Sequence, residues 1–440
     1  MEEAKKEKTA RVKVTEAAKQ IPGLVKRTMV GDPLRAKEEG KPVAYCFICS
    51  LYDEIIRAMD IVPAWVENYA GIVAAKRDQD RFLHKAESEG YSKSLCTYAT
   101  CDLGFDAIRH ELGGMPPNAP WGGIPEPDMM LGSGMQLCEP RYKWAETVQR
   151  YMDVPTYIVG IPWPSFGVNL KEVQGYYVKY VTEQLRGLVE FLEKQTQKKM
   201  DWDRLWSTID LAEKTYKLWW EINALRAKST PTPMGTEDAM NTMVPGTFML
   251  GTPEAFDFYQ GLYNEVKERA DSKMGLIPEE KYRVLWGGGL PPWFALGEFD
   301  YFKAKGAVFP KENSYKPFWE PFEMPKCADP LEHLAWRWLK FWTYRYEKAS
   351  KRPGSHPDVE CLVDYIEEAK IDGVVMHLCF SCRSWHVGLI QQLNTLKKVY
   401  KDIPTLILES DMVDASSYSE ADAHARIDAF IETMETYKST

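Results

Sequence analysis

Short apolar runs alternate with amphipathic stretches in the first third of the chain. Four such runs, each of a length typical of a buried strand, lie at 43–48, 61–66, 128–131 and 156–159. Apolar residues at helical spacing separate them, for example between Arg141 and Met152. Strands that alternate with helices are typical of parallel sheets, because each crossover helix covers a face of the sheet. The pattern therefore predicts an open α/β domain over residues 42–165.

The middle of the chain has a different pattern. Apolar residues at helical spacing predict a helical linker subdomain over residues 166–275. Strand-like runs then return at 282–286, 306–309, 373–376 and 405–408, which predicts a second α/β domain over residues 276–440. Residues 1–41 are expected to form an N-terminal helical arm with a break at Ile21-Pro22-Gly23. The predicted fold class is α/β, with two open, mostly parallel, Rossmann-like domains joined by a helical segment.

Composition narrows the possible partners. The 440 residues are 45% hydrophobic and 27% charged, which is typical of a globular protein. The formal charge of −9, without a long basic block, argues against binding to nucleic acid. No run approaches the ~18–20 apolar residues that cross a bilayer, and the start of the chain lacks the apolar stretch of a signal peptide. We therefore expect a cytoplasmic protein with neither a nucleic-acid nor a membrane partner.

The cysteines are the unusual feature. Nine is an odd number and too few for a disulfide scaffold, which suits a reducing compartment in which thiols can bind metal. Ligands of open parallel sheets bind beyond the carboxyl ends of strands. Cys138 follows the strand expected at 128–131, and Cys379 and Cys382 follow the strand expected to end at Met376. Cys96 lies just ahead of a helix expected to start near Cys101, so these thiols could converge in one cleft.

Spacing alone leaves the role of the thiols open. Three thiolates with one open position suit a [4Fe–4S] cluster whose fourth iron is free for substrate or water. The pairs Cys46/Cys49 and Cys379/Cys382 could instead form a structural zinc site of four thiolates, or one pair could be redox-active. The thiols could also be ordinary core residues, which is the role expected for Cys327 and Cys361.

Three further residues are candidates for proton chemistry. His377 lies beside the Cys382 loop, where it could donate a hydrogen bond to substrate or sulfur. Glu409 and Asp411 end an expected strand and are placed for proton transfer, although a helix-capping or structural role is an equal alternative. We expect His377 and Glu409 to be the catalytic residues. Gly287-Gly288-Gly289 could let the backbone approach a phosphate or thioester, but its surroundings lack a P-loop, so ATP hydrolysis is not expected.

Four motifs occur in an order and spacing that resemble one family. They are Leu95-Cys96-Thr97-Tyr98 with Asp102-Leu103-Gly104, Pro127-Asp128 leading to Cys138, His377 to Gly388 with Ser381-Cys382, and Thr405 to Asp414 with Tyr418-Ser419. From about Pro42 to its C-terminus the chain resembles the catalytic subunits of benzoyl-CoA reductases and 2-hydroxyacyl-CoA dehydratases. Within that family it looks most like a benzoyl-CoA reductase subunit.

The resemblance implies that Cys96, Cys138 and Cys382 hold one [4Fe–4S] cluster. Cys101 and Cys379 depart from the family pattern, and a fourth thiolate from either would close the open iron. The implied partners are a second homologous catalytic subunit, ATP-hydrolysing iron–sulfur activator subunits, ferredoxin as the electron source and an acyl-CoA substrate.

The implied activity is that of an ATP-coupled benzoyl-CoA reductase subunit. Low-potential electrons would pass through the cluster to the aromatic ring of benzoyl-CoA and give a cyclic dienoyl-CoA. One alternative is a subunit of a radical (R)-2-hydroxyacyl-CoA dehydratase. Another is a non-catalytic partner subunit that relays electrons or binds zinc.

Overall fold

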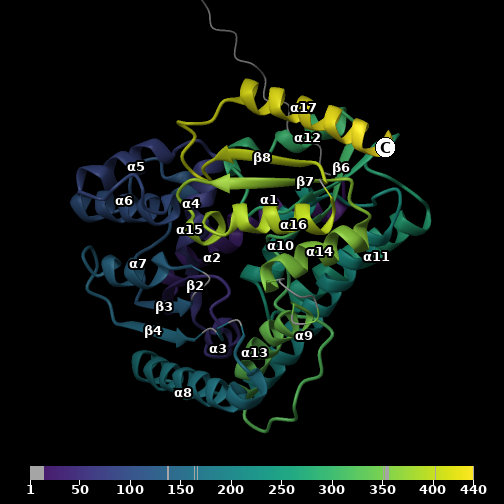
Figure 1. Cartoon of the computed structure of the whole chain (residues 1–440). Coiled ribbons are helices and arrows are strands. Elements are labelled where there is room, and N and C mark those ends of the chain that lie inside the picture. Colours follow the sequence, from purple (N-terminus) through teal and green to yellow (C-terminus); the bar gives the residue numbers. More distant parts are fainter. Residues whose placement is uncertain are drawn as a thin grey trace, which may run out of the picture.

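The computed structural model describes residues 14–135, 138–162, 164–165, 167–349, 351, 356–401 and 403–439. It contains two four-stranded sheets in which every strand pair is parallel. Helices surround both sheets and join them (Figure 1). The predicted α/β fold class is therefore confirmed.

The first sheet has the strand order β2-β1-β3-β4. Its strands are β1 Val43–Cys46, β2 Val62–Trp65, β3 Met129–Met135 and β4 Thr156–Ile161. All four residues of β1 are buried, as expected of a central strand that pairs on both sides. Strand β2 pairs with one edge of β1, and β3 pairs with the other edge. The loops that follow β1 and β3 at their carboxyl ends therefore leave the sheet in opposite directions. Such a switch point is where open α/β sheets bind ligands.

The second sheet repeats this topology, with the order β6-β5-β7-β8. Its strands are β5 Tyr282–Trp286, β6 Ala307–Glu312, β7 Gly373–Cys379 and β8 Thr405–Ser410. One face packs against α14 (Pro357–Ala369) and α16 (Leu389–Val399), and the other against α12 (Glu298–Ala304) and α17 (Glu420–Ser439). The switch point here lies between β5 and β7, and α17 runs above the sheet in Figure 1.

Helices next to the first sheet carry most of the site described below. They are α3 Asp53–Ala58, α4 Val66–Ala75, α5 Gln79–Ser88, α6 Thr97–Leu112 and α7 Pro140–Val148, with a 3₁₀ turn at Pro120–Gly122. A second 3₁₀ turn, Trp293–Ala295, and the short helix α15, Arg383–His386, belong to loops of the second sheet.

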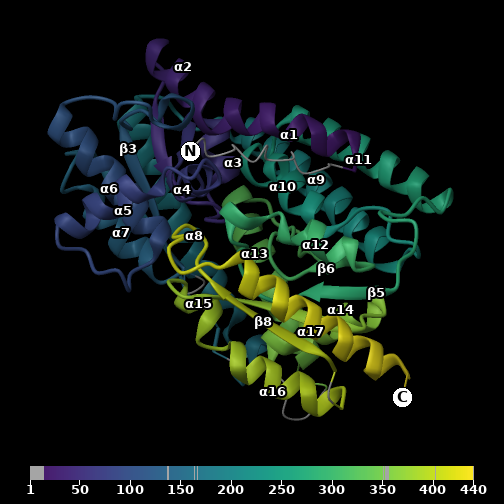
Figure 2. The same cartoon turned by 90° about the horizontal axis from the view of Figure 1, so that it is seen from above.

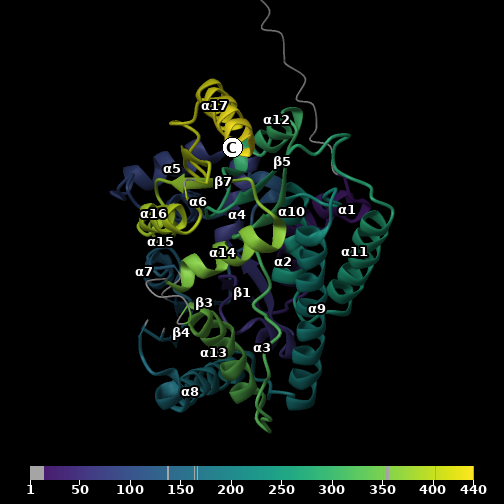
Figure 3. The same cartoon turned by 45° about the vertical axis from the view of Figure 1, so that its right-hand side comes forward.

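Long helices connect the two sheets. They are α8 Leu170–Thr196, α9 Trp202–Lys228, α10 Thr236–Phe248, α11 Pro253–Asp271 and α13 Pro330–Ala349. Figure 3 shows α9 running from the level of the first sheet to that of the second. Near the start of α9, Arg204 forms an ion pair with Asp60. Near its end, Arg226 donates a hydrogen bond of 2.7 Å to Glu312, which is buried at the end of β6. Polar contacts therefore fix α9 at both ends.

The N-terminal arm differs from its prediction. Helix α1 (Glu16–Lys26) continues through Pro22, and the irregularity comes later, as a π-helical turn at Arg27–Gly31 before α2 (Asp32–Glu38). The predicted break at Ile21-Pro22-Gly23 is therefore wrong. The buried face of α1 packs along α10 and α11 (Figure 2), and this packing offsets the hydrogen bond that proline removes. Residues 1–13 of the predicted arm lie outside the described residues.

Two element boundaries near the cysteines also differ. Helix α6 begins at Thr97 rather than near Cys101, so Cys96 is the residue that immediately precedes it. Strand β7 continues to Cys379, three residues beyond its predicted end at Met376. In the part of the chain that the structure describes, every helix is too short or too polar to cross a membrane.

Candidate functional site

Three thiols line one cavity of about 250 Å³, which we call the thiol cavity. They belong to Cys96, Cys138 and Cys382, and each of these residues is partly buried. Cys96 precedes α6, Cys138 lies between β3 and α7, and Cys382 lies between β7 and α15. Two thiols therefore come from loops of the first sheet and one from the second, which places the cavity between the two sheets.

Each thiol lies at the start of a helix. Burial raises the pKa of all three thiols, and backbone N–H groups partly oppose this rise: those of Tyr98 and Ala99 for Cys96, that of Arg141 for Cys138, and those of Ser384 and Trp385 for Cys382. The first turn of a helix has N–H groups without an intrahelical partner, and these can bind an anionic sulfur. The three helix starts thus supply donors to the three sulfurs.

Burial has the largest effect on the pKa of each of these thiols, and it favours the protonated form. It raises the pKa of Cys138 to about 12, although the nearby Arg141 guanidinium opposes the shift. Burial also raises the pKa of Cys96, and the neighbouring sulfurs of Cys138 and Cys382 raise it further. Mutual repulsion between thiolates is relieved when a cation binds them, and the binding releases their protons.

A buried carboxylate fixes two of the three thiol loops relative to each other. Asp411 follows β8, and its Oδ1 accepts a hydrogen bond from Thr97 Oγ1 at 2.6 Å. Its Oδ2 accepts from the Ser381 backbone N–H at 3.2 Å, and Ser381 Oγ in turn accepts from the Thr97 N–H at 3.2 Å. These bonds tie the residue after Cys96 to the residue before Cys382.

A buried ion pair supports the third thiol loop. The Arg141 guanidinium donates to both carboxylate oxygens of Glu67, at 2.7 and 3.1 Å, and its Nη1 donates to the Ile48 carbonyl at 2.8 Å. Arg141 lies in the first turn of α7, three residues after Cys138. The pair therefore joins the Cys138 loop to α4 and to the loop after β1. Sequence reasoning missed it, because 74 residues separate its members.

The predicted catalytic residues His377 and Glu409 lie elsewhere. Both line a second cavity of about 140 Å³, and neither lines the thiol cavity. His377 is completely buried in β7, where Nδ1 pairs with the Leu290 carbonyl and Nε2 lies 2.8 Å from Ser410 Oγ. Burial lowers its pKa to about 4, so the imidazole is neutral near pH 7. Glu409 is largely exposed, 4.0 Å from Arg426.

The remaining cysteines are spread over several places. Cys101 is buried inside α6 and lies near Asp102, and Cys379 Sγ lies 3.8 Å from Asp411 Oδ2; neither residue lines the thiol cavity. Cys46 is buried in β1, and Cys49 lines a separate small cavity. Within the described ranges, no three His, Cys, Asp or Glu side chains are grouped closely enough to hold a metal ion.

The glycine loop after β5 packs against the second sheet. Gly287, Gly288 and Gly289 are all buried, and a Cβ on Gly288 would collide with the backbone nitrogen of His377. A Cβ on Gly289 would collide with the Trp385 ring. A Cβ on Gly287 would meet the side chain of Met376. Close packing of the loop on β7 and α15 thus accounts for all three glycines.

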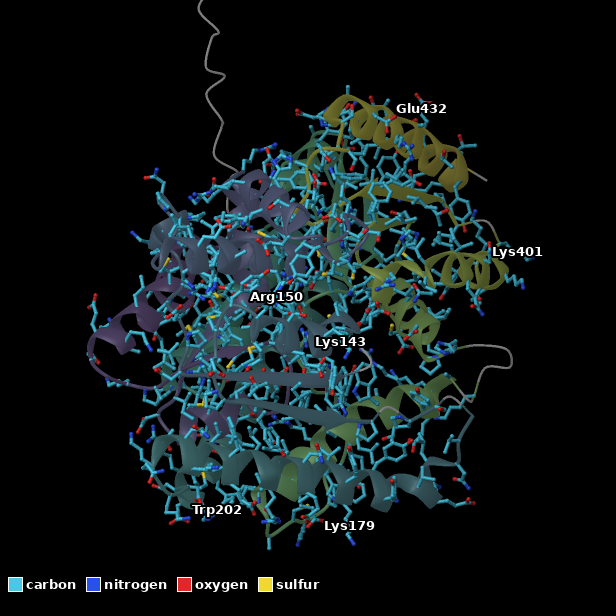
Figure 4. All side chains as sticks on the ribbon, turned by 90° about the vertical axis from the view of Figure 1, so that its left-hand side faces the viewer. Lys143, Arg150, Lys179, Trp202, Lys401 and Glu432 are labelled. Atoms are coloured by element: carbon cyan, nitrogen blue, oxygen red, sulfur yellow. The ribbon has the colours of Figure 1, made fainter. Side chains whose placement is uncertain are left out.

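One side of the thiol cavity is polar and lies on the molecular surface. Glu139, Lys143 and Arg383 line it, and Arg383 and Glu139 form an ion pair across two of the thiol loops. Figure 4 shows Lys143 near the middle of this face, between Glu432 on α17 and Trp202 at the opposite end. The cavity is thus accessible between the two sheets.

Comparison with known proteins extends over most of the chain. Residues 51–434 match the model of the 2-hydroxyglutaryl-CoA dehydratase D-component family. The chain is 25% identical over 402 residues to the (R)-phenyllactyl-CoA dehydratase alpha subunit of Clostridium sporogenes, which covers 91% of each chain. It is 26% identical over 407 residues to the (R)-2-hydroxyisocaproyl-CoA dehydratase alpha subunit of Clostridioides difficile, covering 92% of this chain and 93% of the relative. It is also 26% identical over 415 residues to a benzoyl-CoA reductase subunit of Thauera aromatica, covering 92% of this chain and 91% of the relative.

Proposed function

Since the chain belongs to the 2-hydroxyglutaryl-CoA dehydratase D-component family, we propose that it is a catalytic subunit of an enzyme acting on an acyl-CoA. The family resemblance of the four sequence motifs is confirmed by the match over residues 51–434. The relatives are named as dehydratase and reductase subunits, which supports a role in a multi-subunit enzyme. The observation that carries the proposal is the convergence of Cys96, Cys138 and Cys382 on one cavity.

We propose that these three thiols hold a [4Fe–4S] cluster. Thiolates are the usual ligands of iron–sulfur clusters, and three of them leave one iron open. All three thiols line one cavity of about 250 Å³, which leaves room for a group larger than one ion. Bound there, such a cluster supplies single electrons at low potential.

The chain's own residues have three tasks at this site. Backbone N–H groups at the starts of α6, α7 and α15 donate to the sulfurs, and such bonds tune the potential of a thiolate-bound group. Asp411 holds the loops of Cys96 and Cys382 at a fixed separation. The Glu67–Arg141 pair holds the Cys138 loop, and its positive member lies next to the sulfur.

For the substrate, we propose benzoyl-CoA, with reduction of its ring to a cyclic dienoyl-CoA. The similarity to the benzoyl-CoA reductase of Thauera aromatica supports this choice. A dehydratase acting on an (R)-2-hydroxyacyl-CoA is the second candidate, because dehydratase alpha subunits are similar to this chain at the same level of identity. The proposed partners are a second homologous subunit, an ATP-hydrolysing iron–sulfur activator and ferredoxin.

An anaerobic assay of the assembled complex separates the candidates. The complex receives ATP and a strong reductant, with either benzoyl-CoA or a 2-hydroxyacyl-CoA as substrate. Formation of a dienoyl-CoA supports the reductase, and formation of an enoyl-CoA supports the dehydratase. Cys382→Ser is expected to abolish either activity, whereas Cys327→Ser, at a thiol outside the cavity, keeps it. Turnover of neither substrate by the wild-type complex contradicts the proposal.

A further inference from the structure

A third, much smaller cavity lies beyond the carboxyl end of β1. Its volume is about 20 Å³, and we call it the Asp53 cavity; its lining includes Cys49, Asp53, Glu54, Tyr216 and Arg337. A cavity of this size can hold a single water molecule, and a buried water needs two to four polar partners. Its lining residues carry a thiol, carboxyl groups and a guanidinium that can act as such partners.

The two carboxyl groups of this cavity differ in their partners. Glu54 is fully buried and accepts a hydrogen bond from Arg337 at 2.6 Å. Asp53 is 6% exposed, and its Oδ1 has no hydrogen-bond partner among the described residues. A buried carboxylate without a partner is costly, whereas the neutral acid is tolerated.

Charge around Asp53 also favours its neutral form. Burial and the negative charge of Glu54 together raise the pKa of Asp53 to about 7, although Arg57 and Arg337 partly oppose these effects. The titratable and charged groups that face it come from β1 and its loop, from α3, from α9 and from α13: Cys46, Cys49, Tyr52, Glu54, Arg57, Tyr216 and Arg337. Of these groups, Glu54 is already paired with Arg337.

Cys49 of the Asp53 cavity adjoins the ion pair that supports the Cys138 loop, because the N–H of the preceding residue, Ile48, donates to Glu67 Oε1 at 2.9 Å and the Ile48 carbonyl accepts from Arg141 Nη1 at 2.8 Å. Burial raises the pKa of Cys49, which therefore keeps its proton, and the thiol interacts electrostatically with Asp53 and with the Glu67–Arg141 pair. Tyr315 in turn interacts with both Cys49 and Cys382. Cys49 and Tyr315 have left-handed backbones, with φ of 58° and 52°, a strained conformation that clusters at functional sites.

We propose that Asp53 is the proton store of this site, whose neutral carboxyl supplies protons through the cavity water and the Cys49 thiol to the reaction at the thiol cavity. The inference rests on the proposed function, because both candidate reactions need a proton donor, although in dehydration the substrate carbon also loses one proton, which passes to solvent. Ring reduction adds two electrons and two protons, and dehydration turns a leaving hydroxide into water. In each transfer the Asp53 O–H bond breaks, the water and then Cys49 each accept one proton and release another, and the carboxylate is reprotonated from solvent.

The first test needs no enzyme activity. Thermal unfolding of the full chain is compared for wild type and Asp53→Asn, which mimics the neutral acid, at about pH 6 and about pH 8.5. The folded pKa of Asp53 lies above that of an unfolded aspartate, so its contribution to stability is lost as pH rises through about 7. The melting temperature of Asp53→Asn minus that of wild type is therefore expected to be about 2 °C larger at the higher pH than at the lower pH. Asp60→Asn, at an exposed aspartate close to α3, is the control and should show no such rise. A difference that does not change with pH overturns the proposal.

The second test uses the assembled complex and whichever acyl-CoA the wild type converts. Asp53→Asn should lower kcat by about tenfold or more at neutral pH with KM little changed, and should remove the fall in kcat above about pH 7. Cys49→Ala keeps both carboxyl groups and should lower kcat similarly, which covers the case that Asp53→Asn does not fold. Unchanged kcat in Cys49→Ala or in a folded Asp53→Asn overturns the proposal while the proposed function stands. If the wild type converts neither substrate, the proposed function and this use of the proton both fail, and the unfolding experiment still decides whether Asp53 is neutral.

Discussion

Thr97 donates a hydrogen bond of 2.6 Å to Asp411 across 314 residues of sequence, and both residues are buried. Thr97 opens α6, directly after Cys96, and Asp411 is the first residue after β8. Through Ser381 the same carboxylate holds the residue before Cys382. One carboxylate thereby sets the separation of two proposed cluster ligands that belong to different sheets.

Removal of this carboxylate should therefore affect both stability and cluster binding. Asp411→Ala leaves the Thr97 hydroxyl and the Ser381 N–H without their acceptor, which is expected to cost about 2 kcal/mol or more in the free energy of unfolding. The iron content of the purified protein should fall as well. Glu409→Ala, two residues away at a largely exposed acid, is the matched control and should change stability by less than about 0.5 kcal/mol. Equal effects of the two substitutions would show that Asp411 has no special role.

The Glu67–Arg141 pair should be strongly sensitive to loss of one member. Glu67→Gln leaves the buried Arg141 guanidinium without its counter-charge, which is expected to cost about 3–5 kcal/mol in urea unfolding. Combining it with Arg141→Met should recover part of this loss, because both charges are then gone. The exposed pair Asp210–Lys214 provides the comparison, since Asp210→Asn should cost well under about 1 kcal/mol. A cost for Glu67→Gln as small as that of Asp210→Asn contradicts the account.

His377 should make stability depend on pH on the acid side. Its folded pKa of about 4 lies below the ordinary histidine value because of burial, so its contribution is present above about pH 6.5 and is lost as pH falls through about 4. Relative to His377→Gln, wild-type protein should lose roughly 3 kcal/mol of unfolding free energy over this range. Denaturant titrations at several pH values measure the difference. Parallel pH curves for the two proteins would mean that His377 titrates normally.

Gly288 should not tolerate a side chain. The added Cβ of Gly288→Ala would meet the backbone of His377, which cannot move without disturbing β7, so we expect a cost of about 1–3 kcal/mol. Gly261→Ala, at an exposed position of α11 where a Cβ meets no atom within 4 Å, should instead stabilise the protein by up to about 1 kcal/mol. Thermal unfolding compares the two. A harmless Gly288→Ala would leave the glycine loop free for the ligand role considered from sequence.

Much of the fold could be predicted because each strand is a short apolar run with helices on either side. The less predictable points depended on tertiary contacts. Pro22 suggested a break, but α1 continues through it because its buried face packs on α10. Cys379 looked like a loop residue because the apolar run weakens after Met376, yet backbone pairing with β8 extends the strand to it.

The candidate site residues show the same contrast between positions that sequence patterns predict and positions that depend on tertiary contacts. Cys96, Cys138 and Cys382 were placed by the rule that ligands lie beyond strand ends and by the family motifs, and the structure brings all three to one cavity. The same rule pointed to His377 and Glu409, but both lie inside strands that run further than the apolar pattern indicates. His377 is fixed there against Trp286. Asp411, the first residue past β8, instead holds the loops of Cys96 and Cys382 through Thr97 and Ser381.

The central claim is that Cys96, Cys138 and Cys382 hold an iron–sulfur cluster, and metal analysis of anaerobically purified protein tests it most directly. We expect about four irons and four sulfides per chain in the wild type and in Cys379→Ser and Cys101→Ser, whose thiols lie outside the cavity. Cys96→Ser, Cys138→Ser and Cys382→Ser should each lose most of the iron. Zinc without iron in the wild type, or iron loss in Cys379→Ser equal to that in Cys382→Ser, would contradict the assignment.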